Sequence, residues 1–154
     1  MHPPPRLLVE SEQPLVLSSR TYNQAAAGTF GQYYPALTEA NAIPAGKTGV
    51  IPQLKKNAAF RTNLGLVNLG TAQVTVAITL HGASGAAVGS VKTIAVPAGR
   101  WMQQDDIFAN VGAGTQDVAY ATLEVQTGGG LVWAYASVVD NATGDPTTIP
   151  VLVQ

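Results

Sequence analysis

Two segments of this chain alternate apolar and polar residues position by position, which is the period of a half-buried β-strand. Residues 73–80 read QVTVAITL and residues 118–126 read VAYATLEVQ. Successive side chains of a strand point to opposite faces, so each segment has one face to bury and one face for water. A chain built on such strands packs sheets over a shared core. The predicted buried sets are Val74, Val76, Ile78 and Leu80 in the first segment and Ala119, Ala121, Leu123 and Val125 in the second.

Three more runs are rich in β-branched and aromatic residues and are bounded by turn residues. They span residues 59–68, 89–96 and 131–139. Turn signals recur about every 8–12 residues, which is typical of an all-β sandwich. The sequence therefore predicts an antiparallel immunoglobulin-like β-sandwich of about seven strands. A small β-barrel or a jelly roll shares this periodicity and stays as the alternative.

Two glycine-rich connections predict how neighbouring strands are joined. HGASGAAVG at residues 81–89 predicts a hairpin between the strands on either side of it. GGG at residues 128–130 predicts a second hairpin, which would pair residues 118–126 with residues 131–139.

One segment favours a helix. Residues 101–112 read WMQQDDIFANVG, long enough for a turn or two that Gly112 would end. Asp105 and Asp106 would lie at the helix start, where an aspartate accepts hydrogen bonds from free backbone N–H groups. A paired-carboxylate site is the alternative, but adjacent side chains point apart and do not easily flank one bond.

The composition excludes several classes of protein. The chain has 154 residues and no cysteine, so it is no disulfide scaffold. Eight Lys and Arg nearly balance nine Asp and Glu, which gives no charge cluster for nucleic acid or an anionic membrane surface. No apolar run is long enough to span a bilayer, and residues 1–15 lack the apolar centre of a signal peptide. With only 11% charged residues, the chain is expected to be extracellular, with its export signal further upstream.

The two ends of the chain are similar in sequence. Residues 15–35 read LVLSSRTYNQAAAGTFGQYYP and residues 131–150 read LVWAYASVVDNATGDPTTIP. With small gaps, the aligned pairs are Val9 with Val125, Leu15 with Leu131, Ser19 with Ser137, Asn23 with Asn141, Gly28 with Gly144 and Pro35 with Pro150. Such self-similarity is typical of repeat proteins, although two strands with turn residues can look alike by chance.

The strings AFRTNLGLVNLG, PAGRWMQQDDIF and AYASVVDNATGDPTTIP, in this order, resemble an uncharacterised immunoglobulin-like β-sandwich repeat of secreted bacterial multidomain proteins. The resemblance extends over most of residues 9–150. It implies a module found in tandem or beside other extracellular domains. No catalytic residue is implied by it.

The resemblance and the repeat together predict the domain organisation. Residues 1–8 would be a disordered or vector-derived start, and residues 9–35 a strand and closing loop like the end of a preceding repeat. Residues 36–49 would be a linker or long loop, and residues 50–154 the sandwich, compact together with residues 9–35. The N-terminal strand would complete the sheet of its own domain or pair with a second copy. Deleting residues 1–35 is then expected to expose a sheet edge and to cause aggregation or the loss of a sharp melting transition.

Candidate catalytic and metal-binding residues are sparse. His81 at the end of a strand is expected to be a surface histidine, because one histidine without cysteines cannot supply a metal site. A Ser-His-Asp triad has no G-x-S-x-G motif to support it. In the loop DNATGD, the residues Asp140, Asn141 and Asp145 are expected to stabilise a turn in which Gly144 takes a positive φ. A weak Ca²⁺ site is the alternative there.

The aromatic residues are the best binding candidates. Trp133 lies in the middle of a strand and is expected in the core. Tyr33 and Tyr34, beside Pro35, could form a platform for sugar or peptide or dock onto a neighbouring domain, as could Trp101.

These observations favour a non-catalytic structural or interaction module of a larger secreted or cell-surface protein, one that spaces or displays domains or self-associates. It would need no cofactor. Its partners would be neighbouring repeat domains or a second copy of itself in a strand-paired homodimer. A carbohydrate- or peptide-binding module is the first alternative. An enzyme, with a pocket around His81 or Asp105 and Asp106, is the second.

Overall fold

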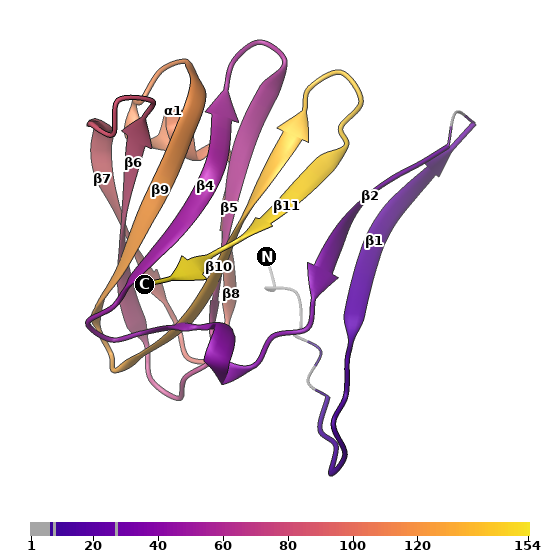
Figure 1. The fold of residues 1–154 in the computed structure, drawn as a ribbon, viewed down its shortest axis with the longest axis vertical. Coiled ribbons are helices and arrows are strands. Elements are labelled where there is room, and N and C mark those ends of the chain that lie inside the picture. Colours follow the sequence, from indigo (N-terminus) through magenta and orange to yellow (C-terminus); the bar gives the residue numbers. More distant parts are fainter. Residues whose placement is uncertain (1–6, 8, 27) are drawn as a thin grey trace.

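The computed structural model describes residues 7, 9–26 and 28–154, and its main body is an antiparallel β-sandwich of two five-stranded sheets (Figure 1). The first, called here the β10 sheet, has the order β11-β10-β5-β8, with β3 also paired to β10. The second, the β9 sheet, has the order β12-β4-β9-β6-β7. The predicted sandwich is confirmed, with more strands than the seven expected because several edge strands are too short to show a period.

The bounds of the strands follow the predicted runs closely in the centre of each sheet. The β10 sheet comprises β3 (Ile43–Pro44), β5 (Phe60–Asn68), β8 (Trp101–Gln104), β10 (Gly130–Asp140) and β11 (Pro146–Pro150). The β9 sheet comprises β4 (Thr48–Lys56), β6 (Val74–Gly82), β7 (Ala87–Val96), β9 (Gln116–Thr127) and β12 (Leu152–Val153).

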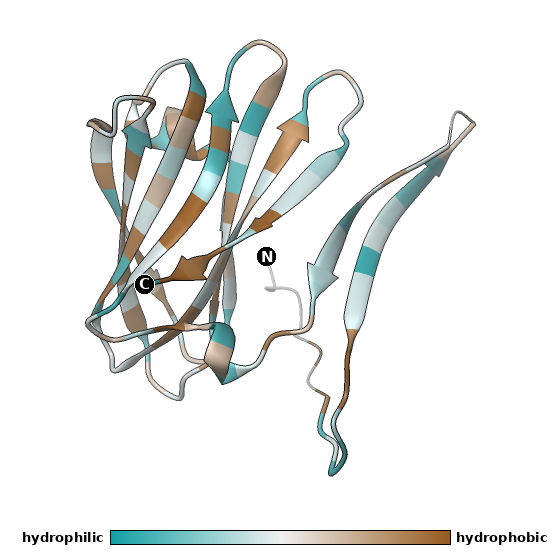
Figure 2. Ribbon diagram, in the orientation of Figure 1, coloured by the Kyte–Doolittle hydropathy of each residue, from teal (hydrophilic) through white to brown (hydrophobic). Residues whose placement is uncertain are grey.

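The core lies between the two sheets, and the alternating segments bury the predicted faces. Val74, Val76, Ile78 and Leu80 on β6 are fully buried, and the four predicted residues of β9 are buried as well. From the opposite sheet, Leu64 and Leu66 of β5 fill the same layer. Figure 2 shows the resulting alternation of apolar and polar residues along these strands.

The predicted hairpin of residues 81–89 is confirmed, because β6 and β7 pair antiparallel. The second predicted hairpin is wrong: β9 pairs with β4 and β6, whereas β10 pairs with β5 and β11 in the other sheet. Gly128 and Gly130, both at positive φ, instead let the chain cross between the sheets. A Cβ on Gly128 would lie 2.0 Å from the Gln73 carbonyl oxygen, and one on Gly130 would lie 2.1 Å from the Ala45 nitrogen. The glycines thus serve a close approach of backbones rather than a tight turn.

The predicted linker of residues 36–49 is ordered and contributes to the core, so this prediction is wrong in part. It holds the 3₁₀ helix η1 (Glu39–Asn41), the strand β3 and the first residues of β4. Ile43 is fully buried between the sheets. A strand of two residues has too few positions to show a period, which is why the sequence does not reveal it.

The predicted helical segment divides into two elements. Its first residues form β8, and the helix α1 (Ile107–Val111) follows. Asp106 is the N-cap, its carboxylate accepting from the Ala109 N–H at 3.4 Å, and Gly112 ends the helix at φ +68°. The capping function predicted for this aspartate pair therefore belongs to Asp106.

The N-terminal part forms a separate two-stranded sheet, called here the arm, made of β1 (Ser18–Ala25) and β2 (Gly28–Pro35). The prediction of one strand followed by a closing loop is therefore wrong. In Figure 1 the arm projects from the sandwich, with β1 on its far side. The predicted disordered start, residues 1–8, lies outside the described residues except for Leu7, which is exposed.

Candidate functional site

The two faces of the arm differ in what they contact. In the β1–β2 register, Tyr22 lies opposite Gly31 and Arg20 opposite Tyr33, so Arg20, Tyr22 and Tyr33 share one face. Tyr22 is 60% exposed and Tyr33 54% exposed, which makes this the outer face. The alternate residues of β2 point the other way, toward the sandwich.

The inner face of the arm is docked on the β10 sheet through Gln32 and Tyr34. The Tyr34 ring meets the Tyr135 ring edge-on, with centroids 5.5 Å apart. The Tyr34 hydroxyl donates to Gln32 Oε1 at 2.8 Å, and the Ser137 hydroxyl donates to the same oxygen at 3.3 Å. These contacts are all within one chain, so they hold the arm in place on its own sandwich.

Tyr135 is the centre of the aromatic cluster beneath the arm. It stacks on Trp133 at 5.1 Å, and its hydroxyl accepts from Trp101 Nε1 at 3.2 Å. The ring lies over Gly65, where an added Cβ would come within 2.2 Å of it. Burial, with a smaller contribution from Tyr34, raises the pKa of Tyr135 well above its usual range. The cluster explains why β10 is buried on both faces.

The two long edges of the arm have different surroundings. On the β2 edge, the Thr148 hydroxyl of β11 donates to the Tyr33 carbonyl oxygen at 2.6 Å, and the Gly31 N–H donates to Asp145 Oδ1 at 3.2 Å. The β1 edge lies on the other side of the arm. All eight β1 residues are exposed, and among the described residues β2 is the one strand that pairs with β1.

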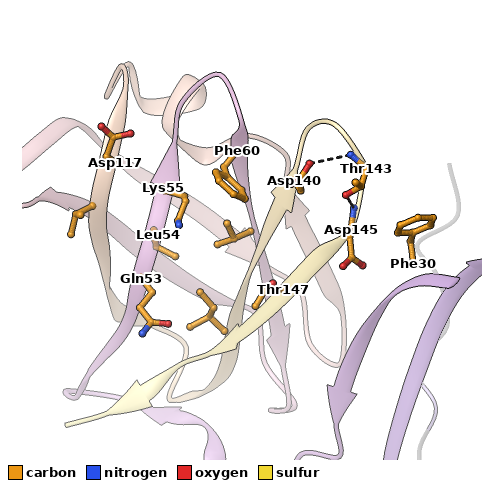
Figure 3. Close-up of a pocket in the computed structure, with 13 residues that line it drawn as sticks. Phe30, Gln53, Leu54, Lys55, Phe60, Asp117, Asp140, Thr143, Asp145 and Thr147 are labelled. Carbon is orange, nitrogen blue, oxygen red and sulfur yellow. Dashed lines mark hydrogen bonds between the residues drawn. The ribbon is translucent and has the colours of Figure 1, made fainter. Parts of the chain in front are cut away.

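An open groove of about 670 Å³ lies between β4 and β11, with Phe30 of the arm at its rim (Figure 3). Leu54 and Val138 are its buried apolar residues, and the exposed carboxylates of Asp117 and Asp145 border it. This arrangement supplies surface for contact with another molecule.

The DNATGD loop is a turn stabilised by its own side chains. One Asp140 carboxylate oxygen accepts from the Ala142 N–H at 2.7 Å and the Thr143 N–H at 3.0 Å, and these bonds lower the pKa of Asp140. Asn141 bonds to Arg61 and to the Ala58 carbonyl oxygen, while Asp145 accepts from the arm. The three candidate Ca²⁺ ligands thus serve different partners. Gly144 has φ +75°, as predicted.

His81 and Asp106, the other candidates for chemistry, have structural partners of their own. His81 stacks on Tyr120, and its two ring nitrogens contact the Gly85 carbonyl oxygen at 3.1 Å and the Thr122 hydroxyl at 3.0 Å. Asp106 forms an ion pair with Lys56. Across the described parts of the chain, no group of three or more His, Asp or Glu residues could hold a metal ion.

The structure separates the predicted binding aromatics. Tyr34 and Trp101 both contact Tyr135 in the cluster under the arm, and Trp133 is buried there at 3% exposure. Tyr33 stays exposed and is joined on the outer face by Tyr22, which the sequence analysis missed. Only the strand register reveals this neighbour, because SSRTYNQA has no apolar alternation.

The comparisons with known proteins concern the fold alone. No family model matches the chain, and no curated protein matches it significantly. The crystal structure of Thermotoga maritima 1070 is similar, with a TM-score of 0.51 and 11% identity over 71% of this chain and 92% of that one. Within the described residues, no helix has the length and apolar character needed to cross a membrane.

Proposed function

We propose that this chain is a non-catalytic interaction module of a larger secreted or cell-surface protein and that the β1 edge of the arm is its contact surface. The module would space or display neighbouring domains or hold copies together. The observation that carries the proposal is the exposed β1 strand, held at a fixed position by the docked inner face of the arm.

A strand that is held in place on one edge and has no strand partner on its other edge among the described residues is suited to protein contacts. Its outward N–H and C=O groups can bond to an extended segment of another chain, which is how β-strand addition provides affinity. The arm carries one charged residue, Arg20, so an incoming strand meets little charge to desolvate. Because β2 is already docked through Tyr34, the arm loses little conformational entropy when a partner binds.

The polar residues that could have indicated catalysis have other roles. His81 is held by a carbonyl oxygen and a hydroxyl, Asp106 caps a helix, and Asp140 caps a turn. An active site needs such groups to converge on one reacting position. Their separate structural partners support a module that works by contact.

The proposal is tested by panning a random-peptide phage library against the wild type, Tyr22→Pro and Tyr22→Thr. Proline removes one backbone N–H from the strand, whereas threonine keeps the N–H and the β propensity but loses the ring. We expect enriched peptides that bind the wild type and the threonine variant but not the proline variant. Peptides that bind all three proteins equally, or no enrichment at all, would contradict the proposal.

A second function is favoured by the outer face of the arm. Tyr22 and Tyr33 are exposed and diagonal to each other across β1 and β2, within reach of one flat ligand. Such a pair can stack on a sugar ring, which would make the module carbohydrate-binding. Titration with soluble polysaccharides tests this: Tyr22→Thr and Tyr33→Ser would each abolish sugar binding, whereas contact through the β1 edge survives both changes.

A further inference from the structure

Among the described residues, β1 has the one long sheet edge without protection against pairing with another strand. Natural sheets guard their edges with proline, lysine, bulges, short strands or a covering segment. Over its eight residues, β1 has no proline, no lysine and an unbroken register with β2. Directly before it, Leu15, Val16 and Leu17 expose a run of apolar side chains. An edge of this kind favours pairing with another strand.

The other edges of the described structure are guarded. On β4, Pro52 and a break in the register interrupt the edge. The edge of β7 is interrupted by Lys92 and by Gly89, which has φ +71°. The outer strands β8 and β12 have four and two residues, and β11 is covered by β2. Compared with these protected edges, the edge of β1 is the one most open to pairing with another strand.

Hydrogen bonds around the arm show which β1 backbone groups point outward. The Leu17 carbonyl oxygen accepts from the Ala36 N–H at 3.1 Å, so the odd-numbered residues of β1 face β2. Gly31 and Tyr33 direct their backbone groups away from β1, toward β11, so their opposite residues Tyr22 and Arg20 face the free edge. The outward set is therefore Ser18, Arg20, Tyr22 and Gln24.

From this outward set we infer that β1 pairs antiparallel with β1 of a second copy, with the two Thr21 residues facing each other across a two-fold axis. The inference rests on the proposed contact function of the β1 edge and names its partner. An antiparallel pair of identical strands is self-complementary and closes on two copies. The product is a four-stranded sheet, β2-β1-β1-β2, with one sandwich at each side.

The register follows from the geometry of the outward residues. Only outward residues can bond across the new edge, so even-numbered residues must pair with even-numbered residues. Centring on Thr21 pairs all four of them and forms about eight hydrogen bonds, two for each hydrogen-bonded pair. Centring on Arg20 or on Tyr22 pairs three of the four, and centring on Arg20 also sets two like charges opposite each other, which is destabilising.

Side chains match in the Thr21-centred register. Arg20 lies opposite Tyr22 of the second copy, and within one chain the Arg20 guanidinium already lies 5.7 Å from the Tyr22 ring centre. Each cation thus gains a second aromatic face, which is favourable. Leu17, 40% exposed in the single chain, falls opposite Ala25 of the second copy and loses water contact. The pairing therefore buries apolar surface and introduces no charge repulsion.

The test uses disulfide formation, for which the chain is suited because it has no native cysteine. Thr21 would be in a non-hydrogen-bonded pair, with Cα atoms about 4.5 Å apart, within the range that a disulfide spans. Thr21→Cys should form a covalent dimer under mild oxidation. Ser18→Cys is the matched control, because two Ser18 residues would lie about 20 Å apart, six residues along the strand. Mixing Ser18→Cys with Gln24→Cys should form a disulfide between the two variants.

Light scattering on the wild type completes the test. We expect twice the 15.9 kDa of one chain, and the mass of one chain for Tyr22→Pro. A wild type that is monomeric at millimolar concentration would overturn the inference, and so would a dimer in which Ser18→Cys forms disulfides as readily as Thr21→Cys. In both cases, phage peptides that bind the wild type but not Tyr22→Pro would still support the contact function of the arm, so the two failures are distinguishable.

Discussion

The hairpin β10–β11 and the hairpin β1–β2 come from the two similar stretches of the sequence, and they end in the same way. In each, the second strand ends at a proline, and the N–H of the next residue bonds back to the first strand or to the residue directly before it. The Val151 N–H donates to the Ala134 carbonyl oxygen at 3.0 Å, and the Ala36 N–H donates to the Leu17 carbonyl oxygen at 3.1 Å. The backbone of the two hairpins is therefore closed alike.

Their environments are nevertheless opposite. Strand β10 is an interior strand of its sheet, paired with β5 and β11 and buried along most of its length. Strand β1 is exposed at every residue. The segment LVWAYASVV has apolar side chains for both faces, whereas SSRTYNQA has few for either. The comparison shows that backbone pairing makes a hairpin, while side chains decide whether a sheet forms around it.

The largest difference between the two hairpins is expected in the free energy of unfolding, when one tyrosine of each is replaced by alanine. Tyr135→Ala should lower the free energy of unfolding by about 3–5 kcal/mol, because it removes a buried ring that contacts Trp133 and Tyr34. Tyr22→Ala should change it by no more than about 0.5 kcal/mol in the dilute monomer, because the ring is exposed. Urea unfolding measures both. Equal losses would show that the arm is part of the cooperative fold.

A smaller effect is expected when the arm is removed. The sequence alone predicts that deleting residues 1–35 exposes a sheet edge and causes aggregation or the loss of a sharp melting transition. Neither sheet of the sandwich contains β1 or β2, so we expect the sandwich to stay folded, with a loss of about 1–3 kcal/mol from the contacts of Tyr34 and Gln32. The deletion does uncover the edge of β11, because the contact of Thr148 with the Tyr33 carbonyl oxygen is lost. Thermal unfolding should remain one sharp transition. A deletion variant without a cooperative transition would mean that the sandwich depends on the arm.

The tyrosines should also differ in their effect on stability at high pH. Burial raises the pKa of Tyr135 above its ordinary value of 10.0, so the folded state keeps a proton that the unfolded chain releases. This contribution to stability is complete below pH 10 and is lost as the pH rises above it. The decrease in Tm above pH 10 should be smaller in Tyr135→Phe than in the wild type. Tyr33→Phe, at an exposed position, is the control and should leave the decrease unchanged.

The smallest effect concerns the loop that closes β10–β11. Because Asp140, Asn141 and Asp145 bond to separate partners, millimolar CaCl₂ should leave the Tm and the Asp140 NMR signals unchanged, with MgCl₂ as the control. An increase in Tm with calcium alone would establish a metal site in this loop.

The turn at Asp140 should also depend on pH. The N–H groups of Thr143 and Ala142 lower the pKa of Asp140 by bonding to its carboxylate. The contribution of these bonds to stability is therefore present above the ordinary pKa of 3.8 and is lost as the pH falls through the lowered value.

Single strands and residues show how much of the fold and of the candidate site can be predicted from the sequence. Period two identifies β6 and β9 and the residues they bury, because alternation is a local property of one strand. The same reasoning gives the wrong partner for β9, since GGG is compatible with a hairpin and with a crossing between sheets. It also misses Ile43, because β3 has only two residues. Among the candidate binding residues, Tyr33 is exposed, whereas Tyr34 and Trp101 are held by Tyr135.

The sequence by itself determined that the chain forms short antiparallel strands with one buried face each, because alternation, turn residues and low charge act locally. It also predicted that the pair Asp105 and Asp106 lies at a helix start and that Gly144 takes a positive φ. The tertiary structure alone decided which strands share a sheet, which tyrosines are covered, and that one edge of β1 has no strand partner in the described part of the chain. These depend on contacts between residues far apart in the chain, such as Tyr34 on Tyr135 and Thr148 on the Tyr33 carbonyl. Local sequence patterns carry no record of such partners.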